Sequence, residues 1–65
     1  MPYVKIEMFA GRSREQKTAL VKAVTDAFVA HAGSRPEDVQ IVIQDVAKSE
    51  WATGGVFADR RDKLA

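Results

Sequence analysis

The sequence predicts an α/β fold in which residues 1–65 form one domain, a single β-α-β unit followed by a C-terminal hairpin and completed by oligomerisation. Three observations lead to this prediction. Residues 3–9 and 39–46 each alternate between two faces, as strands do. Between them, about 20 residues carry apolar side chains at helical spacing. The chain has only 65 residues but is 46% hydrophobic, which is more than one small core can hide.

The first strand and the helix have clear local signals. The two faces of the strand at residues 3–9 carry Val4, Ile6 and Met8 on one side and Tyr3, Lys5, Glu7 and Phe9 on the other. Ser13 followed by Gln16 matches a capping box, and Gly33 suits the left-handed position after the helix end. The helix therefore starts at about Ser13 and stops before Gly33.

Two stripes are expected along this helix. The apolar positions at helical spacing are Leu20, Val21, Val24, Ala27, Phe28 and Ala32. The polar stripe consists of Lys17, Thr18, Lys22, Thr25 and Asp26. Further apolar residues lie outside both stripes at Ala19, Ala23, Val29 and Ala30. This excess predicts a second packing partner.

The second strand and the tail complete the unit. A cap is expected at Ser34 with Glu37, and Pro36 is placed to begin one helical turn. A strand at residues 39–46 after a helix of this length runs parallel to the first, with a right-handed crossover. Two parallel strands alone are not a viable sheet, so other copies of the chain are expected to supply more. Gly54 and Gly55 predict a hairpin turn, because a phosphate loop would need a lysine and a following helix.

The composition excludes several classes of function. The net charge is +1 and basic and acidic residues are interspersed, so the chain lacks the basic patch of a nucleic-acid-binding protein. No apolar run approaches the roughly 20 residues that span a bilayer. The absence of cysteine excludes disulfides and thiolate metal sites, and His31 alone cannot build a zinc site. We expect no cofactor and no metal. The lack of cysteine and of a targeting segment favours the cytoplasm.

Pro2 is the first candidate functional residue. If the initiator methionine is removed, Pro2 becomes a free secondary amine that can act as a base or a nucleophile. A free α-amino group has a reference pKa near 8, and partial burial lowers it toward the neutral range where a general base works best. The alternative is an ordinary proline at a strand start, where no ladder hydrogen bond is needed.

Arg12 and Trp51 are the next candidates. Arg12 lies in the turn after the first strand, where a guanidinium can hold a carboxylate or enolate with two parallel hydrogen bonds; a solvated loop arginine is the alternative. Trp51 can form the wall of a pocket, anchor a subunit interface, or do both. His31, in the last turn of the helix, is interpreted as a dipole partner or surface residue.

The order of these residues resembles the 4-oxalocrotonate tautomerase family, within the tautomerase superfamily, over nearly the whole chain. The specific parts are the start "MPYV", the turn "AGRSREQK", the segment "DVAK" at the end of the second strand, and the "W" before "GG". The resemblance implies the tautomerase fold, hexamers built as trimers of dimers, and active sites shared between subunits. It also implies a small-molecule carboxylic acid as substrate and no cofactor.

By position, the resemblance implies that Pro2 is the amino-terminal catalytic base, that Arg12 binds the carboxylate end of the substrate, and that Trp51 is the pocket aromatic. We also assign Phe9 to the substrate-binding residues. Gln40, likewise assigned to substrate binding, departs from the pattern, because the best-known members have a second arginine there.

The departure at Gln40 changes the expected substrate preference. Its amide can donate a hydrogen bond but brings no positive charge. We expect weaker turnover of the dicarboxylate 2-hydroxymuconate, or a different preferred substrate. Arg35 and Lys48 are the two residues considered as sources of the lost charge.

The sequence therefore predicts a cofactor-independent tautomerase of small 2-hydroxydienoate or enol-pyruvate acids, such as the 2-hydroxymuconate of aromatic hydrocarbon catabolism. One alternative is a hydratase or dehalogenase of small unsaturated acids on the same scaffold, which needs a carboxylate in the tail. Thr53 stands where that carboxylate is expected, and Glu50 lies nearby. The other alternative is a non-enzymatic oligomeric module.

Overall fold

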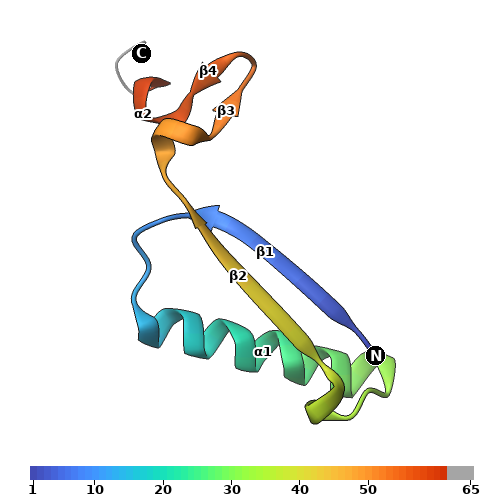
Figure 1. Cartoon of the computed structure of the whole chain (residues 1–65). Coiled ribbons are helices and arrows are strands. Elements are labelled where there is room, and N and C mark those ends of the chain that lie inside the picture. Colours follow the sequence, from blue (N-terminus) through green and yellow to red (C-terminus); the bar gives the residue numbers. More distant parts are fainter. Residues whose placement is uncertain (62–65) are drawn as a thin grey trace.

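The computed structural model describes residues 1–61 and shows one β-α-β unit with a tail that projects from it (Figure 1). Its elements are β1 (Tyr3–Phe9), α1 (Arg14–Ala32), the 3-10 helix η1 (Pro36–Asp38) and β2 (Gln40–Val46). The strands pair in parallel, from Tyr3 opposite Gln40 to Phe9 opposite Val46, and α1 covers one face of the sheet. The predicted fold class is confirmed. Residues 62–65 of the predicted domain lie outside the described residues.

The predicted ends of α1 are confirmed. The Ser13 hydroxyl accepts the N–H of Gln16 at 3.1 Å, and the Gln16 side chain accepts the N–H of Ser13 at 2.9 Å. These two bonds form the capping box and satisfy donors that the first helical turn leaves free. At the other end, Gly33 has a φ of 68°, a left-handed conformation that glycine adopts without steric cost.

Two predictions after α1 are wrong. Ser34 does not cap the next turn. The N-cap residue of η1 is Arg35, and its side chain makes no capping hydrogen bond. The N–H of Ser34 instead donates to the carbonyl of Phe28 at 3.3 Å and helps to close α1. Pro36 opens the turn as predicted, and its carbonyl accepts the N–H of Val39 at 3.2 Å. Since that N–H is used in the turn, β2 begins at Gln40 and not at Val39.

The alternation predicted for both strands is confirmed. Half-buried apolar residues of the sheet face α1, and the half-buried apolar residues of α1 face them. The first set is Val4, Ile6, Met8, Ile41 and Ile43, and the second is Leu20, Val21, Val24 and Phe28. Among the described residues none is fully buried. One chain therefore builds only a thin, single-layered core.

The polar stripe predicted along α1 is wrong at Lys17 and Thr25. Both are half-buried, and the ammonium of Lys17 lies 2.6 Å from the carboxylate of Asp45 on β2. The long apolar stem of Lys17 covers the sheet while its charge reaches Asp45 at the edge. Thr25 satisfies its hydroxyl on the Val21 carbonyl at 2.7 Å, so it can sit against the sheet.

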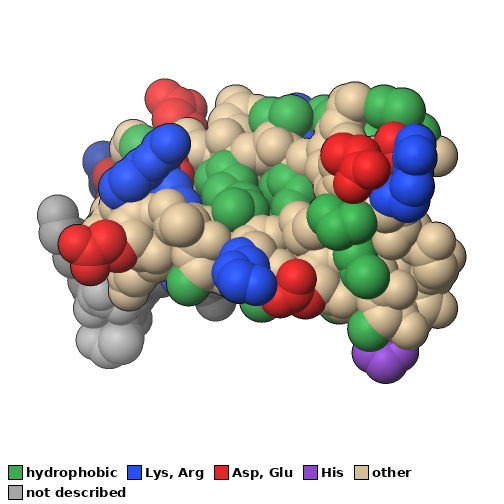
Figure 2. Space-filling view, turned by 90° about the horizontal axis from the view of Figure 1, so that it is seen from below, with side chains coloured by type: hydrophobic (Ala, Val, Ile, Leu, Met, Phe, Trp, Pro, Cys, Tyr) green, Lys and Arg blue, Asp and Glu red, His purple; other side chains and the backbone are tan. Residues whose placement is uncertain are grey.

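The chain is more extended and more exposed than a globular monomer of its size. Its radius of gyration is 15.4 Å, whereas about 11 Å is typical for 65 residues. Its accessible surface is 5075 Å², whereas about 4,100 Å² is typical for a folded monomer of 7.2 kDa. On the sheet face opposite α1, Tyr3 is 60% exposed and Val42 44%. Hydrophobic side chains also reach the surface on the side of α1 (Figure 2).

The tail contains the predicted hairpin. After the 3-10 helix η2 (Lys48–Glu50), the strands β3 (Ala52–Thr53) and β4 (Val56–Phe57) pair antiparallel, and α2 (Ala58–Arg61) follows. Gly54 and Gly55 form the turn with φ values of 61° and 84°, and a type I′ hairpin turn requires a positive φ at both positions. Within residues 1–61, no helix combines the length and hydrophobicity needed to cross a membrane.

Candidate active site

Four side chains gather where β1 ends, and they belong to Phe9, Arg12, Lys48 and Trp51. Gly11, with a φ of 125°, turns the chain after β1, and Arg12 follows it. One guanidinium nitrogen of Arg12, Nη1, donates to the carbonyl of Phe9 at 3.0 Å. This bond holds the arginine at the end of the sheet while its other donors remain available to a ligand.

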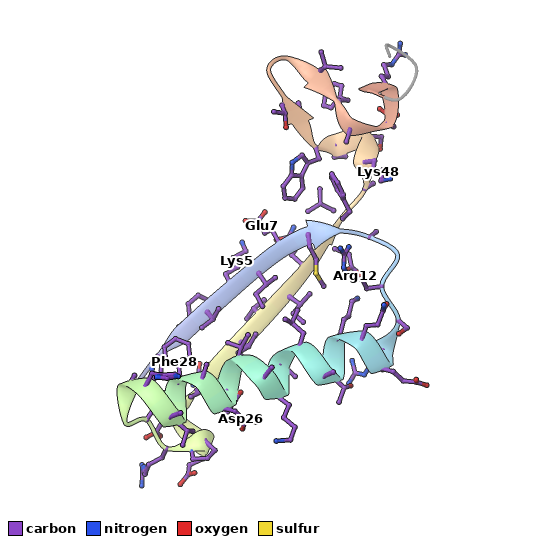
Figure 3. The ribbon with its side chains drawn as sticks, turned by 180° about the vertical axis from the view of Figure 1, so that it is seen from behind. Lys5, Glu7, Arg12, Asp26, Phe28 and Lys48 are labelled. Carbon is purple, nitrogen blue, oxygen red and sulfur yellow. The ribbon has the colours of Figure 1, made fainter. Side chains whose placement is uncertain are left out.

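Trp51 and Lys48 reach the same place from the tail. The rings of Phe9 and Trp51 meet edge to face, with centroids 5.0 Å apart and planes at 68°. The ammonium of Lys48 lies 5.6 Å from the centroid of the Phe9 ring. The backbone of Trp51 is held in place because its carbonyl accepts the N–H of Ala58 at 2.7 Å. Figure 3 shows Arg12 and Lys48 at this end of the sheet.

A hollow of about 330 Å³ lies beside Trp51 and is lined by Glu7, Val46, Glu50, Trp51 and Ala52. Glu7 shares the strand face of Phe9, the face turned away from α1 (Figure 3). Two carboxylates, Glu7 and Glu50, therefore line this hollow. The sequence interpretation missed Glu7, although its alternation with Phe9 along β1 was the available signal.

Pro2 and Gln40 lie at the opposite end of the sheet. The N–H of Gln40 donates to the carbonyl of Pro2 at 3.0 Å, so the two backbones are adjacent. Gln40 stands opposite Tyr3 on the exposed face, whereas Pro2 is half-buried. Met1 is 83% exposed.

The structure thus brings Phe9, Arg12 and Trp51 together but keeps them away from Pro2 and Gln40. β1 is seven residues long, and at about 3.3 Å per residue it separates the two ends by about 23 Å. A small acid cannot touch both ends of one chain. The arrangement can act as one site only if the ends of different chains meet.

A protein-family model described as "Tautomerase enzyme" matches residues 2–60. The chain belongs to the tautomerase family. Since the family is one of isomerases, the chain is a 4-oxalocrotonate tautomerase-like isomerase.

Individual tautomerases support this assignment. A 2-hydroxymuconate tautomerase of Comamonas testosteroni is 43% identical over 58 residues, which cover 89% of this chain and 92% of that protein. A solved 4-oxalocrotonate tautomerase isozyme of Methylibium petroleiphilum has a TM-score of 0.84 and 40% identity, covering 89% of this chain and 94% of its own. A heterohexamer 4-oxalocrotonate tautomerase of Chloroflexus aurantiacus has a TM-score of 0.88 and 33% identity, covering 94% and 98%.

Arg35 and His31, the other charged or titratable residues considered in this tautomerase, are not part of the group formed by Phe9, Arg12, Lys48 and Trp51. Arg35 is held by Asp38 through contacts of 3.0 and 3.4 Å, and its Nε lies 4.0 Å from a carboxylate oxygen of Glu37. His31 is exposed at the end of α1, beside a shallow apolar hollow. Within residues 1–61, no three potential metal ligands of the His, Cys, Asp or Glu type cluster.

Proposed function

We propose that this tautomerase interconverts small 2-hydroxydienoate or enol-pyruvate acids without a cofactor. Pro2 acts as the general base, and Arg12 binds the carboxylate. In this reaction one proton leaves the substrate and is returned at a different atom, so composition is conserved and no co-reactant is consumed. The observation that carries the proposal is the 43% identity to a 2-hydroxymuconate tautomerase across 89% of the chain.

The position of Pro2 suits a base once Met1 is removed. Removal turns the Pro2 nitrogen into a secondary amine at the head of β1. The carbonyl of Pro2 is anchored by the N–H of Gln40, so the residue is held while its nitrogen stays free. The exposure of Met1 supports trimming, because a processing enzyme must reach it.

The proposed site is shared between copies of the chain. Pro2 of one copy meets Arg12, Phe9 and Trp51 of another, because the length of β1 prevents them from meeting within one chain. The excess of accessible surface, about 950 Å² over a compact monomer, is similar to the roughly 800 Å² that each partner buries in a standard interface. The heterohexamer relative supports an assembly of six chains, for which we propose a trimer of dimers.

The test combines mass with kinetics. The intact mass of the mature chain is expected to lack Met1. Ketonisation of 2-hydroxymuconate and phenylenolpyruvate by the purified protein is expected, with a loss of about 100-fold or more in Pro2→Ala, since general bases typically contribute 10²–10⁴-fold. Equal rates for the two proteins would remove Pro2 from the mechanism.

Hydration or dehalogenation is the second candidate, favoured by one observation. Glu50 lines the hollow beside Trp51, where a carboxylate can activate water. Incubation with 3-haloacrylates and an assay for halide separates this reaction from tautomerisation. Halide release that is lost in Glu50→Gln would support it.

A further inference from the structure

We propose that Lys48 is a second carboxylate-binding residue, which acts with Arg12 on the same substrate group. The inference rests on the proposed function only for the identity of the substrate, because binding of a carboxylate can be measured without turnover. It starts from the position of Lys48, whose ammonium lies 5.6 Å from the centroid of the Phe9 ring.

Phe9 links the two cations. Its ring faces Lys48, and its carbonyl accepts the hydrogen bond from Arg12 at 3.0 Å. Both cations are therefore tied to one residue at the end of β1, with Trp51 against the same ring. The Lys48 ammonium, on its flexible four-carbon stem, can turn from the ring toward an anion bound beside Phe9.

Lys48 is free to exchange its present contact for an anion. Over the described part of the chain, neither Lys48 nor Arg12 lies within ion-pair distance of a carboxylate. A cation over an exposed aromatic ring gains only modestly, whereas a charge-assisted hydrogen bond is stronger. Arg35, the other residue considered as a replacement charge, is already engaged by Asp38 and Glu37.

The carboxylates beside Trp51 favour a second cation for an anionic substrate. Glu7 and Glu50 line the hollow beside Trp51, and each repels an anionic substrate. A lysine in addition to Arg12 reduces that repulsion for an anion bound at this end of the sheet.

The experiment measures the binding of an unreactive carboxylate to the assembled protein. Trp51 is the only tryptophan, so its fluorescence reports ligands at this end of the sheet. Phenylacetate and its uncharged amide, phenylacetamide, are titrated against the wild type, Lys48→Met, Lys48→Arg and the control Lys22→Met, with calorimetry as a second readout. Lys22 is an exposed lysine of α1 that pairs with Asp26.

Loss of one charge-assisted hydrogen bond corresponds to about a tenfold change in affinity. We expect Lys48→Met to raise the Kd of phenylacetate about tenfold and to leave the Kd of phenylacetamide unchanged. Lys48→Arg should restore most of the affinity, and Lys22→Met should have no effect.

Three results would overturn the proposal: no binding of phenylacetate by the wild type, the same Kd in Lys48→Met, or an equal change for both ligands, which would indicate a purely structural role. Failure of the proposed function has a different signature. In that case the wild type binds phenylacetate but ketonises neither enol acid.

Discussion

Gln40 is the residue at which this tautomerase departs from the pattern of the family it resembles. It lies beside the backbone of Pro2, and its side chain is exposed on the face of the sheet opposite α1. Arg35, considered as a replacement charge, is engaged by Asp38. Arg12 and Lys48 lie at the other end of β1.

Gln40→Arg is expected to raise kcat/KM for 2-hydroxymuconate about tenfold relative to phenylenolpyruvate. A charge-assisted bond replaces a neutral one in a site that other copies of the chain are proposed to close to water, which is worth about 1–2 kcal/mol in the transition state. Gln44→Arg, on the same face of β2, is the matched control and should leave the ratio unchanged. An equal change in both variants would show a general effect of charge.

At the scale of elements, α1 shows which local signals decide a helix end. Ser13 and Ser34 look alike in the sequence, since each precedes a glutamine or glutamate by three residues. Only Ser13 forms the capping box, because α1 continues for 19 residues beyond it and leaves N–H groups to satisfy. The chain after Ser34 makes a single 3-10 turn whose start is set by Pro36.

Ser13→Ala is therefore expected to destabilise the protein by about 1 kcal/mol, the usual cost of losing a helix cap. Ser34→Ala should change stability by only a few tenths of a kcal/mol, because its backbone N–H makes the bond to Phe28 and is kept in the variant. Thermal unfolding of both variants at one fixed protein concentration measures the difference. Equal losses of stability would contradict the assigned cap.

At the scale of the whole molecule, the thin core and the separation between the ends of β1 have the same consequence. A two-stranded sheet with one covering helix leaves Tyr3 and Val42 open on its second face. Other copies of the chain can cover that face and can also bring Arg12 to Pro2. If the site is shared as proposed, stability and the completed site depend on the same assembly.

Mixed assemblies test the shared site. Pro2→Ala and Arg12→Ala are each expected to be nearly inactive. If their chains are unfolded together in equal amounts and refolded, roughly a quarter of the sites should combine an intact Pro2 with an intact Arg12 from random pairing of symmetric copies. Recovery of activity on mixing supports sharing. A mixture that stays as inactive as its components would show that one chain supplies both residues.

Val42→Asp tests the open face of the sheet. A charge there must be desolvated when another copy covers it, so the assembly is expected to shift toward monomers and to lose activity. Sedimentation at several concentrations measures the mass. Lys22→Glu, an exposed change on α1, is the control and should keep the wild-type mass. An unchanged mass in Val42→Asp would place the interface elsewhere.

The sequence by itself predicted the main elements and named most residues of the candidate site, but not Glu7. Period-two alternation, the Ser13 capping box, Gly33 and the Gly54-Gly55 turn are local signals, and they need no knowledge of distant residues. The local signals did not determine the burial of Lys17 and Thr25, the engagement of Arg35, or the contact of Lys48 with Phe9. Each of these depends on tertiary or neighbouring contacts that a residue pattern does not encode.

Only the tertiary structure decided which candidate residues lie at the same end of the sheet. The residue pattern places Pro2 ten positions before Arg12 but does not give the distance between them, whereas the extended strand β1 between them is about 23 Å long. A parallel pairing then puts Gln40 beside Pro2 and leaves Phe9 and Trp51 with Arg12. The physical reason is that strand geometry fixes the distance between the ends of β1.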